Sequence, residues 1–401
     1  MKDKDAIGFI LRLGRALHSY GYAAHRLEES LGAVSQQMGI EAQFFSTPTA
    51  ISVAFGPQDD QRTFLIRVQP GDQDLGKLAH VDRVILDVLA GRLTPAEGSA
   101  QVEAIVASTP RYGPLVTTFV FGVVSAAAAR FLGGGLIEIG IAAILGLITG
   151  LLAVGVTHVP STGRIFEPAA AFAVAFTAAA ASVIIVPHSV FIATLAGLIV
   201  LIPGFTLTVA LTELATRHLA SGTARVASAA VTFLGIIFGV ALGGKVAALV
   251  VGASVIVEPL PLPVWTEWMA LAIAPFGLAI LLRAEPEDWI WVAFAGWLAF
   301  GGARGGGILL GPELGAFVGA LLVGGASNLY ALFRDRPSQI PLAPGILLLV
   351  PGSIGFRSLA SLLDRQVISG VEAAFTMVLT AIALVSGLLV ANVVIPRRTS
   401  G

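Results

Sequence analysis

The sequence predicts a helical membrane protein, with about ten transmembrane helices arranged as two inverted five-helix repeats behind a small α+β cytoplasmic domain. Three observations lead to this prediction: the composition, the uneven distribution of charge, and a motif that occurs twice. Of the 401 residues, 56% are hydrophobic and 12% are charged, and the mean hydropathy is +0.86. Soluble domains carry about 25% charged residues. Most of this chain is therefore expected to lie in a lipid bilayer.

The distribution of charge separates two domains. Residues 1–110 carry 10 Lys/Arg and 13 Asp/Glu, whereas the following 291 residues carry only 14 and 12. We therefore expect a cytoplasmic domain over 1–110 and a transmembrane domain over 111–401. The net charge of −1 gives no basis for a nucleic-acid partner, and the absence of cysteine excludes disulfides and cysteine-based metal sites. Charges interrupt the first apolar stretch, which is not typical of a cleavable signal peptide.

The first 110 residues predict four elements. Apolar residues recur at three- and four-residue spacing from Ile7 to Met38, which indicates one amphipathic helix that ends at Gly39. Two segments rich in β-branched and aromatic residues, 43–55 and 62–69, are separated by GPQDDQ and predict a β-hairpin. A helix is expected from about 75 to 89. Another is expected from Thr94, because Pro95 and Glu97 follow it as in a typical helix start.

Several polar residues of the first helix raise the possibility of an enzyme. His18, His25, Arg26, Glu28 and Glu29 lie near one another, and His25 and Glu29 are one turn apart, as in a metal or acid–base site. A solvated helix face with an i,i+4 pair is the more common explanation of such a pattern. The chain contains no GxxxxGK[ST], HExxH or GxSxG motif. We therefore predict neither an enzyme nor a cofactor or metal.

Ten apolar spans follow residue 110, and several approach the roughly 20 residues that cross a bilayer. The two within 268–303 are short and poorly separated. Glycines recur at four-residue spacing in the fifth and eighth spans, at 235, 239 and 243 and at 311, 315 and 319, which predicts close helix packing. The spans are 114–132, 135–156, 167–186, 188–214, 226–252, 268–282, 289–303, 306–333, 339–363 and 370–395.

One motif, LIPGFTLTVALTELATRHLASGTAR over 201–225, returns 148 positions later as LVPGSIGFRSLASLLDRQVISGVEA over 349–373. Its Pro-Gly pair, an arginine and a Ser-Gly pair all match between the copies. This predicts a duplication, with repeats of about 111–257 and 258–401. Each repeat holds five spans, an odd number, so the second must enter the membrane from the opposite side, as in many secondary transporters.

The arginines between spans agree with the ten-helix count. With the first domain in the cytoplasm, nine arginines lie at cytoplasmic span ends and three at outer ends, as the positive-inside rule expects. Both chain termini are then cytoplasmic. The cytoplasmic set is Arg111, Arg164, Arg217, Arg225, Arg283, Arg334, Arg336, Arg397 and Arg398, and the outer set is Arg130, Arg304 and Arg365.

The two Pro-Gly pairs predict a binding site. Proline cannot donate its backbone N–H and glycine adds freedom, so Pro203-Gly204 and Pro351-Gly352 should each break a helix. A broken helix is tolerated in hydrocarbon only against protein or a watery cavity. The N–H groups that follow each break can bind a carboxylate; a simple proline kink is the alternative reading. The residues beyond the breaks that offer N–H or hydroxyl groups are Phe205, Thr206, Thr208, Thr212, Ser353, Ile354 and Ser358.

Ionisable residues inside apolar spans are costly and indicate function. Arg357, about a turn and a half beyond the second break, is expected to hold a carboxylate or to pair with an acid. Glu213 is expected to bind an ammonium group or a coupling proton, or else to face the cytoplasmic rim. Lys245 is expected to join an ion pair or to reach the outer interface. Glu138, near a helix start, and Arg304, in a glycine-rich segment expected to be a loop, are weaker candidates.

At these motifs the chain resembles the threonine/serine exporter family of prokaryotic membrane proteins. The first domain matches through LxxGRALHSYGYAAHRLEESL and FSTPTAISVAF, and the second through LIPGFTLTVALTELA and LLVPGSIGFRSLASLL. The resemblance implies a cytoplasmic domain followed by about ten transmembrane helices in the inner membrane. It also implies export of threonine and serine driven by the proton-motive force. Some relatives divide the two parts into separate subunits linked to succinate export.

We therefore predict a proton-coupled secondary exporter of small polar amino acids, with a midplane cavity between the two breaks and one repeat rocking against the other. Its partners would be the amino acid, protons and the bilayer, and the sequence predicts no oligomeric state. Export of a small dicarboxylate such as succinate is the alternative within transport. A membrane-anchored hydrolase and a sensor, each acting through residues 1–110, are alternatives from other classes.

Overall fold

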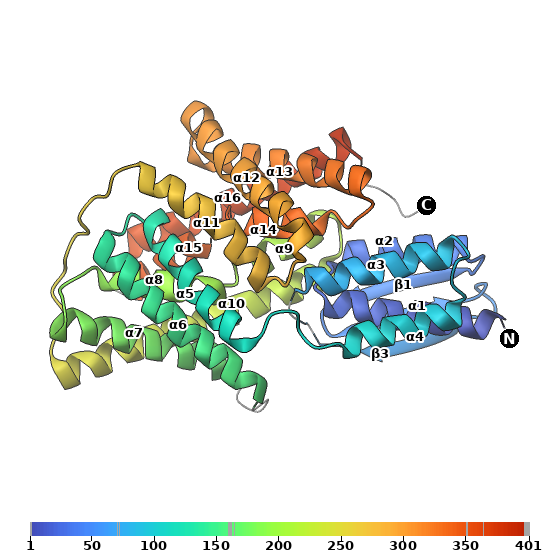
Figure 1. The fold of residues 1–401 in the computed structure, drawn as a ribbon, viewed down its shortest axis with the longest axis horizontal. Helices are drawn as coiled ribbons and strands as arrows, with labels where there is room; N and C mark the ends of the chain where they lie inside the picture. The colour runs from blue at the N-terminus through green and yellow to red at the C-terminus, as the bar shows by residue number, and fades with distance from the viewer. Residues whose placement is uncertain are drawn as a thin grey trace.

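The structure, a computed structural model, describes residues 2–69, 71, 73–158, 163, 165–349, 352–363 and 365–396. Of the residues named above, Pro351, Arg164, Arg397 and Arg398 lie outside the described residues. Figure 1 shows a small α+β head, which ends at Ala107, beside a larger helical body that begins at Pro114.

The head contains four helices and a three-stranded antiparallel sheet in the order β1-β2-β3. The predicted single helix over 7–38 is wrong, because the chain turns at Gly21, whose φ of 85° is one that glycine adopts at little cost. The segment 43–55 also divides, since Pro48-Thr49 forms a turn within it. The elements are α1 Lys2–Ser19, α2 Ala24–Gln37, β1 Ala42–Thr47, β2 Ala50–Phe55, β3 Arg62–Arg67, α3 Leu75–Leu89 and α4 Pro95–Ala107.

Other local predictions for the head are confirmed. The GPQDDQ segment joins β2 to β3, and a helix runs from Leu75 to Leu89. At the start of α4, the Thr94 hydroxyl accepts a hydrogen bond from the Glu97 backbone N–H, while the Glu97 carboxylate accepts one from the Thr94 N–H at 2.8 Å. This is the reciprocal capping arrangement that the Thr-Pro-x-Glu sequence favours.

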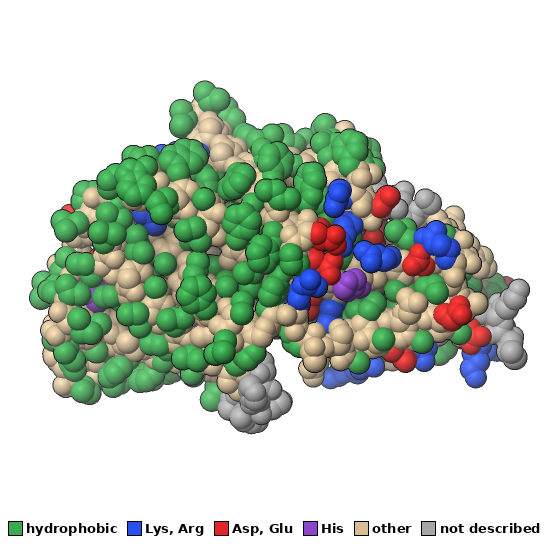
Figure 2. Space-filling view, in the orientation of Figure 1, with side chains coloured by type: hydrophobic (Ala, Val, Ile, Leu, Met, Phe, Trp, Pro, Cys, Tyr) green, Lys and Arg blue, Asp and Glu red, His purple; other side chains and the backbone are tan. Residues whose placement is uncertain are grey.

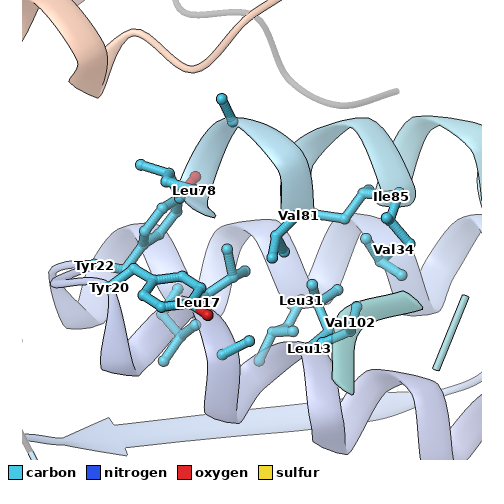
Figure 3. Packing of buried hydrophobic residues seen from close by; sticks show 14 of the residues in the cluster. Leu13, Leu17, Tyr20, Tyr22, Leu31, Val34, Leu78, Val81, Ile85 and Val102 are labelled. Carbon is cyan, nitrogen blue, oxygen red and sulfur yellow. The ribbon is translucent and has the colours of Figure 1, made fainter. Parts of the chain in front are cut away.

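The core of the head packs its helices against one another and against the sheet. Leu13 and Leu17 of α1 face Leu31 of α2 and Val81 of α3 (Figure 3). Side chains of β2 alternate between buried and half-buried along the strand, as in a strand with one face on a core. The same buried cluster also includes Val292, Tyr330 and Ile340 of the body. Head and body therefore share one continuous apolar core.

All regular secondary structure in the described residues of the body is helical. Seven helical segments of the described body are long and apolar enough to span a membrane, and one of them joins α14 and α15; the count is eight if the pair 190–197 and 199–215, bent by 53°, also counts as one span. The helices are α5 Pro114–Phe131, α6 Leu136–His158, α7 Phe166–Ile184, α8 Val190–Gly197, η2 Ile199–Leu201, α9 Gly204–Ala215, α10 Leu219–Val251, α11 Trp265–Leu281, η3 Pro286–Asp288, α12 Trp289–Leu310, α13 Pro312–Arg334, α14 Gln339–Leu347, α15 Gly352–Leu363 and α16 Val367–Val394.

The count of ten membrane spans is not confirmed. The α11 helix has 17 residues, and α12 has the length of a span but is diluted by its glycines, its tryptophans and Arg304. The expected loop around Arg304 is wrong, because α12 continues through it to Leu310. The break comes at Gly311, whose φ is 93°.

Local structure recurs at the spacing of the repeated motif. Arg217 and Arg365, which are 148 residues apart, end α9 and α15 with φ values of 66° and 61°. Beyond each arginine a Ser-Gly pair enters the next helix. An added Cβ on Gly222 would lie 2.7 Å from Leu214 Cγ, and one on Gly370 would lie 2.6 Å from Leu362 Cγ.

The longer helices pair in the same way in both halves. The α7 helix packs along α10, and α13 packs along α16. A Cβ added to Gly239 would lie 2.2 Å from the Pro168 carbonyl oxygen, and one on Gly387 would lie 2.4 Å from that of Phe317. In both halves, glycine thus allows one helix backbone to approach another closely.

The contact at Gly239 can be tested by substitution. We expect Gly239→Ala to destabilise the protein by about 1–3 kcal/mol, since the new methyl group forces two helix backbones apart. Gly235→Ala, one turn earlier on the same face, should have little effect because its Cβ would meet Pro168 Cδ at 3.7 Å. Thermal inactivation in detergent compares the two variants, and equal midpoints would contradict the packing described here.

Candidate functional site

The first helix break lies between α8 and α9. Pro203 has φ −77° and ψ 39°, which is not helical, and the Gly204 N–H bonds back to the Ile202 carbonyl at 2.8 Å. The Leu207 N–H donates to the Pro203 carbonyl at 3.0 Å. This is the first hydrogen bond within α9. The N–H groups of Phe205 and Thr206 come before it, so α9 contains no carbonyl one turn earlier to accept from them. They point out of the start of the helix.

The second break meets the first. The α15 helix starts at Gly352, and a Cβ added there would lie 2.7 Å from Ile202 Cγ2 and 3.5 Å from Gly204 Cα. The starts of α9 and α15 are therefore in contact, although they are 148 residues apart in the sequence. Glycine at 352 leaves the space that this approach requires.

Each broken helix also packs into the other half of the body. Phe205 of α9 packs against a cluster of the second half that contains Ala299 and Leu384. Phe356 of α15 is buried in a cluster of the first half with Phe233 and Ile236. A movement of one half relative to the other must therefore disturb the region of the two breaks.

A cavity of about 420 Å³ lies beside the second break. It contains the ion pair between Arg304 Nη1 and Glu267 Oε1, at 3.0 Å, with side chains 48% and 21% exposed. Hydroxyl groups come from Thr376 and Thr380 of α16. The residues that line it are Glu267, Phe300, Ala303, Arg304, Pro312, Ala316, Leu348, Leu349, Ile354, Thr376 and Thr380.

The threonines beyond the first break are largely engaged within their own helix. The Thr208 hydroxyl donates to the Gly204 carbonyl at 3.2 Å, and the Thr212 hydroxyl donates to the Thr208 carbonyl at 2.8 Å. Both side chains are buried. Thr206 and Ser353 are half-buried at the first turns of α9 and α15.

The predicted cations lie on exposed faces. Lys245 is exposed on α10, and Arg357 is exposed on α15. Arg357 follows Ile354 by three residues, so it lies one turn further along roughly the same helix face as this cavity-lining residue. The structure gives neither cation a carboxylate partner among the described residues, and their roles remain predictions.

Glu213 lies at the junction of head and body, and not in the cavity. Its fully buried carboxylate accepts hydrogen bonds from the Ala24 N–H at 2.8 Å, the Ser221 hydroxyl at 2.7 Å and Arg225 Nε at 3.1 Å. Figure 2 shows charged side chains gathered at this junction, whereas the visible surface of the body is mainly apolar. The location of Glu213 at this junction does not test its predicted role in proton coupling.

His25 and Glu28 of α2 face the same junction, whereas Glu29 is exposed. His218 Nε2 lies 3.3 Å from Glu28 Oε2, and the rings of His25 and His218 are 5.9 Å apart. His18 is buried, and its Nε2–H donates to the Thr47 carbonyl at 3.1 Å. Within the part of the chain that the structure describes, no three His, Asp or Glu residues form a group that would hold a metal ion.

Sequence reasoning finds the cavity only in part: it names Ile354 and gives Arg304 as a weaker candidate. It assigns Arg304 to a loop, because the six glycines of α12 resemble a flexible segment. It does not identify Glu267, which follows the proline-rich segment 259–263 at the start of a short span. Thr380 carried a usable signal, because it matches Thr232 at the 148-residue spacing.

The fold is that of a helical membrane protein with a folded head docked on it and with paired helix breaks, a feature common among transporters. A family model described as "Putative threonine/serine exporter" matches residues 8–247, and one described as "Threonine/Serine exporter, ThrE" matches residues 267–394. The chain belongs to the threonine/serine exporter family.

The curated relatives include several yeast membrane proteins. "Pheromone-regulated membrane protein 10" of Debaryomyces hansenii is 27% identical over 91% of this chain and 37% of its own length. The proteins of the same name from Eremothecium gossypii and Saccharomyces cerevisiae are also 27% identical, over 92% of this chain and 50% and 48% of their own lengths. The chain thus spans half or less of these relatives. No solved structure gives a significant match.

His18 makes the stability of the head depend on pH. Burial lowers the pKa of His18 below its ordinary value; the hydrogen bond to Thr47 opposes this shift, and the positive charge of Arg225 adds to it. As the pH falls, His18 is therefore protonated at a higher pH in the unfolded chain than in the folded protein. The free energy of unfolding should decrease below about pH 6.5, by about 1.4 kcal/mol for each unit of pKa difference.

His18→Gln should reduce this decrease, because the glutamine amide can still donate to the Thr47 carbonyl but does not titrate. Thermal unfolding of the full chain between about pH 7 and pH 5 measures the effect. An equal decrease in the variant and the wild type would show that His18 is not the group responsible.

Proposed function

We propose that this protein is a proton-coupled secondary exporter of small polar amino acids, threonine and serine. The observation that carries the proposal is the cavity beside the second helix break, which contains one arginine and one glutamate. An amino acid carries one carboxylate and one ammonium group, so a site with one charge of each sign complements it. The family to which the chain belongs supports the same substrate class.

In this proposal the carboxylate of the substrate replaces Glu267 as the partner of Arg304, and Glu267 binds the ammonium group. The first-turn N–H groups of α15, at Ser353 and Ile354, add hydrogen bonds to the carboxylate, as helix N-termini do for anions. The hydroxyls of Thr376 and Thr380 bind the hydroxyl of a threonine or serine side chain. Arg357, exposed one turn beyond Ile354, attracts the carboxylate toward the site.

The membrane arrangement that fits this mechanism has ten crossings in two inverted repeats. It counts α11 and α12 as crossings and treats each broken helix as one. The recurring contacts at Gly222 and Gly370, and at Gly239 and Gly387, support the duplication. In this arrangement the head and both termini lie in the cytoplasm and the body lies in the inner membrane, an orientation that the arginine distribution supports.

We assign proton coupling to Glu213, which lies next to the start of α10. Lys245, near the other end of that helix, is a further charge. A carboxylate withdrawn from water, with one cationic partner in Arg225, can exchange its ion pair for a proton. Threonine uptake into inside-out vesicles should therefore increase when a proton gradient, acidic inside, is imposed. An equal rate of threonine uptake with and without the gradient would contradict proton coupling but would not affect the proposed substrate.

A dicarboxylate exporter is the second candidate within transport. It would need a cavity with more positive than negative charge, and the balanced Arg304–Glu267 pair favours an amino acid. An excess of unlabelled serine should therefore compete with labelled threonine, whereas succinate should not. Inhibition of threonine transport by succinate and not by serine would favour a dicarboxylate exporter.

Substitution of Arg304 tests the binding site. Arg304→Ala should raise the half-saturating threonine concentration about 10- to 100-fold, because a charge-assisted hydrogen bond contributes about 1.5–3 kcal/mol. Transport of labelled threonine by purified protein in liposomes measures this change. Arg304→Lys should retain part of the affinity.

Arg92→Ala is the matched control, since it removes an arginine from an exposed ion pair with Asp87 in the head. It should transport as the wild type does. Unchanged transport in both Arg304→Ala and Arg357→Ala would remove this site assignment.

A further inference from the structure

The head bridges the two halves of the body. On the first half, the Ala24 N–H at the start of α2 donates to Glu213, and Glu28 contacts His218. On the second half, the Leu75 N–H donates to the Leu282 carbonyl at 2.9 Å. One rigid domain therefore holds the last turn of α9 and the end of α11 at the same time.

Further contacts strengthen the attachment to the second half. The Gly76 N–H donates to the Arg283 carbonyl at 3.1 Å, and Asp74 pairs with Arg283 at 3.4 Å. Arg26 donates to the hydroxyl of Ser338, just before α14, at 3.0 Å. The contact with the first half includes one fully buried acid, Glu213, the His218–Glu28 pair, the neighbouring rings of His25 and His218, and packing of α10 against β1.

The buried acid belongs to the contact with the head and not to the repeated unit. The position that matches Glu213 in the second copy is Ser361, which is half-buried, and the residue that matches Ser221 is Ser369, which is exposed. The local fold of the repeat therefore does not need a carboxylate here. In the first copy, the acid is covered and receives a hydrogen bond from the head.

Helix α9 links this contact directly to the helix breaks. Glu213 lies in its last turn and Gly204 at its start, so the 12 residues of α9 form a rigid connection about 18 Å long. Gly204 in turn touches Gly352 at the start of α15. A head that holds Glu213 thus restrains the place where the two halves meet.

The cavity lies toward the other end of the body. Glu267 is in the first turn of α11, whereas Leu282, which contacts the head, follows its last turn. The 17 residues of α11 separate these ends by about 25 Å. The body therefore has its cavity at the end away from the head, while the head covers the opposite end.

We propose that the head is a clamp that keeps the two halves of the body closed at its own end, and that the Glu213–Ala24 contact must break before α9 can move. This inference rests on the proposed function, because it assigns the head a place in alternating access. Opening at the head end requires the halves to separate there. The head cannot remain bound to both halves during that movement.

A removable cross-link tests whether the clamp must open. The chain contains no cysteine, so Glu28→Cys and His218→Cys provide the sole thiols, at a contact between head and first half whose side chains are partly exposed. A short, cleavable bifunctional thiol reagent should reduce threonine transport in liposomes at least tenfold, and cleavage of the reagent should restore it. A monofunctional reagent on the same variant is the control. Transport at the full rate by the cross-linked protein would overturn the proposal.

A labelling experiment tests the latch without any substrate. Ala24→Cys places a small buried thiol at the contact and keeps the backbone N–H that binds Glu213. In this background, Glu213→Ala should accelerate reaction with a water-soluble maleimide at least tenfold, and Glu213→Gln should have a smaller effect. Glu103→Ala, which removes an exposed acid of the head, should leave the rate unchanged.

Ser35→Cys, buried elsewhere on α2, shows whether the head itself has unfolded. It should react slowly in every variant. A slow reaction of Ala24→Cys in the Glu213→Ala protein would refute the latch. Because the readout needs no transport, it separates failure of the clamp from failure of the proposed substrate.

Discussion

The constraint on which the structure depends is the contact between two interrupted helices in the middle of an apolar body. A break leaves backbone N–H groups without carbonyl partners, and hydrocarbon offers none in return. The chain meets this constraint by placing the start of α15 against the start of α9, with Gly352 close to Ile202 and Gly204. The N-terminal N–H groups of both helices are thereby kept inside the protein. Polar groups become concentrated at one place, next to the cavity, instead of facing lipid.

The two halves are similar around this contact but differ at their ends. Both use a residue with positive φ to end the broken helix, Arg217 in one and Arg365 in the other. The first half then meets the head through a buried acid, whereas the matching end of the second half has exposed or half-buried serines. The proposed duplication would account for the structure that the two halves share. The head contacts the motif of the first half through Glu213, and this makes the two ends of the molecule unequal.

Much of the fold could be predicted from the sequence, because its signals are local or periodic. The capping residues of α4, the strand-forming segments and the apolar helices follow from short-range rules. The matched Pro-Gly pairs also pointed to the region where the helices meet. The break at Gly21 was missed, because apolar periodicity continues across it and a glycine in a helix is not by itself a stop.

The candidate site was harder to predict, since it depends on side chains that are distant in the sequence. Arg304 and Glu267 become partners only when α11 and α12 pack together. Glycines that serve close packing in α12 look the same in the sequence as those of a loop. The same holds for Glu213: its place in an apolar span indicated function, but its partner Ala24 is a backbone group 189 residues away and has no sequence signature.

The charges at the head end differ in kind from those of the cavity. Arg336 donates to Asp288 at 2.6 Å and to Glu285 at 2.9 Å, and Tyr330 donates to Asp288, so these acids are buried and satisfied. Burial alone would raise the pKa of Glu285, but the hydrogen bond and charge of Arg336, together with the contacts of Glu287 and His80, outweigh burial and lower this pKa.

Such a network is costly to break, because loss of one partner leaves a buried charge uncompensated, at about 3–5 kcal/mol. The Arg304–Glu267 pair is partly exposed to solvent, and a solvent-exposed pair contributes at most about 1 kcal/mol. The proposed substrate can therefore separate the cavity pair at little cost, whereas the ion pairs of Arg336 lie within the second half and hold together its end next to the head. Of the contacts at the head end, the set around Glu213 is the one whose release frees a helix that reaches the breaks.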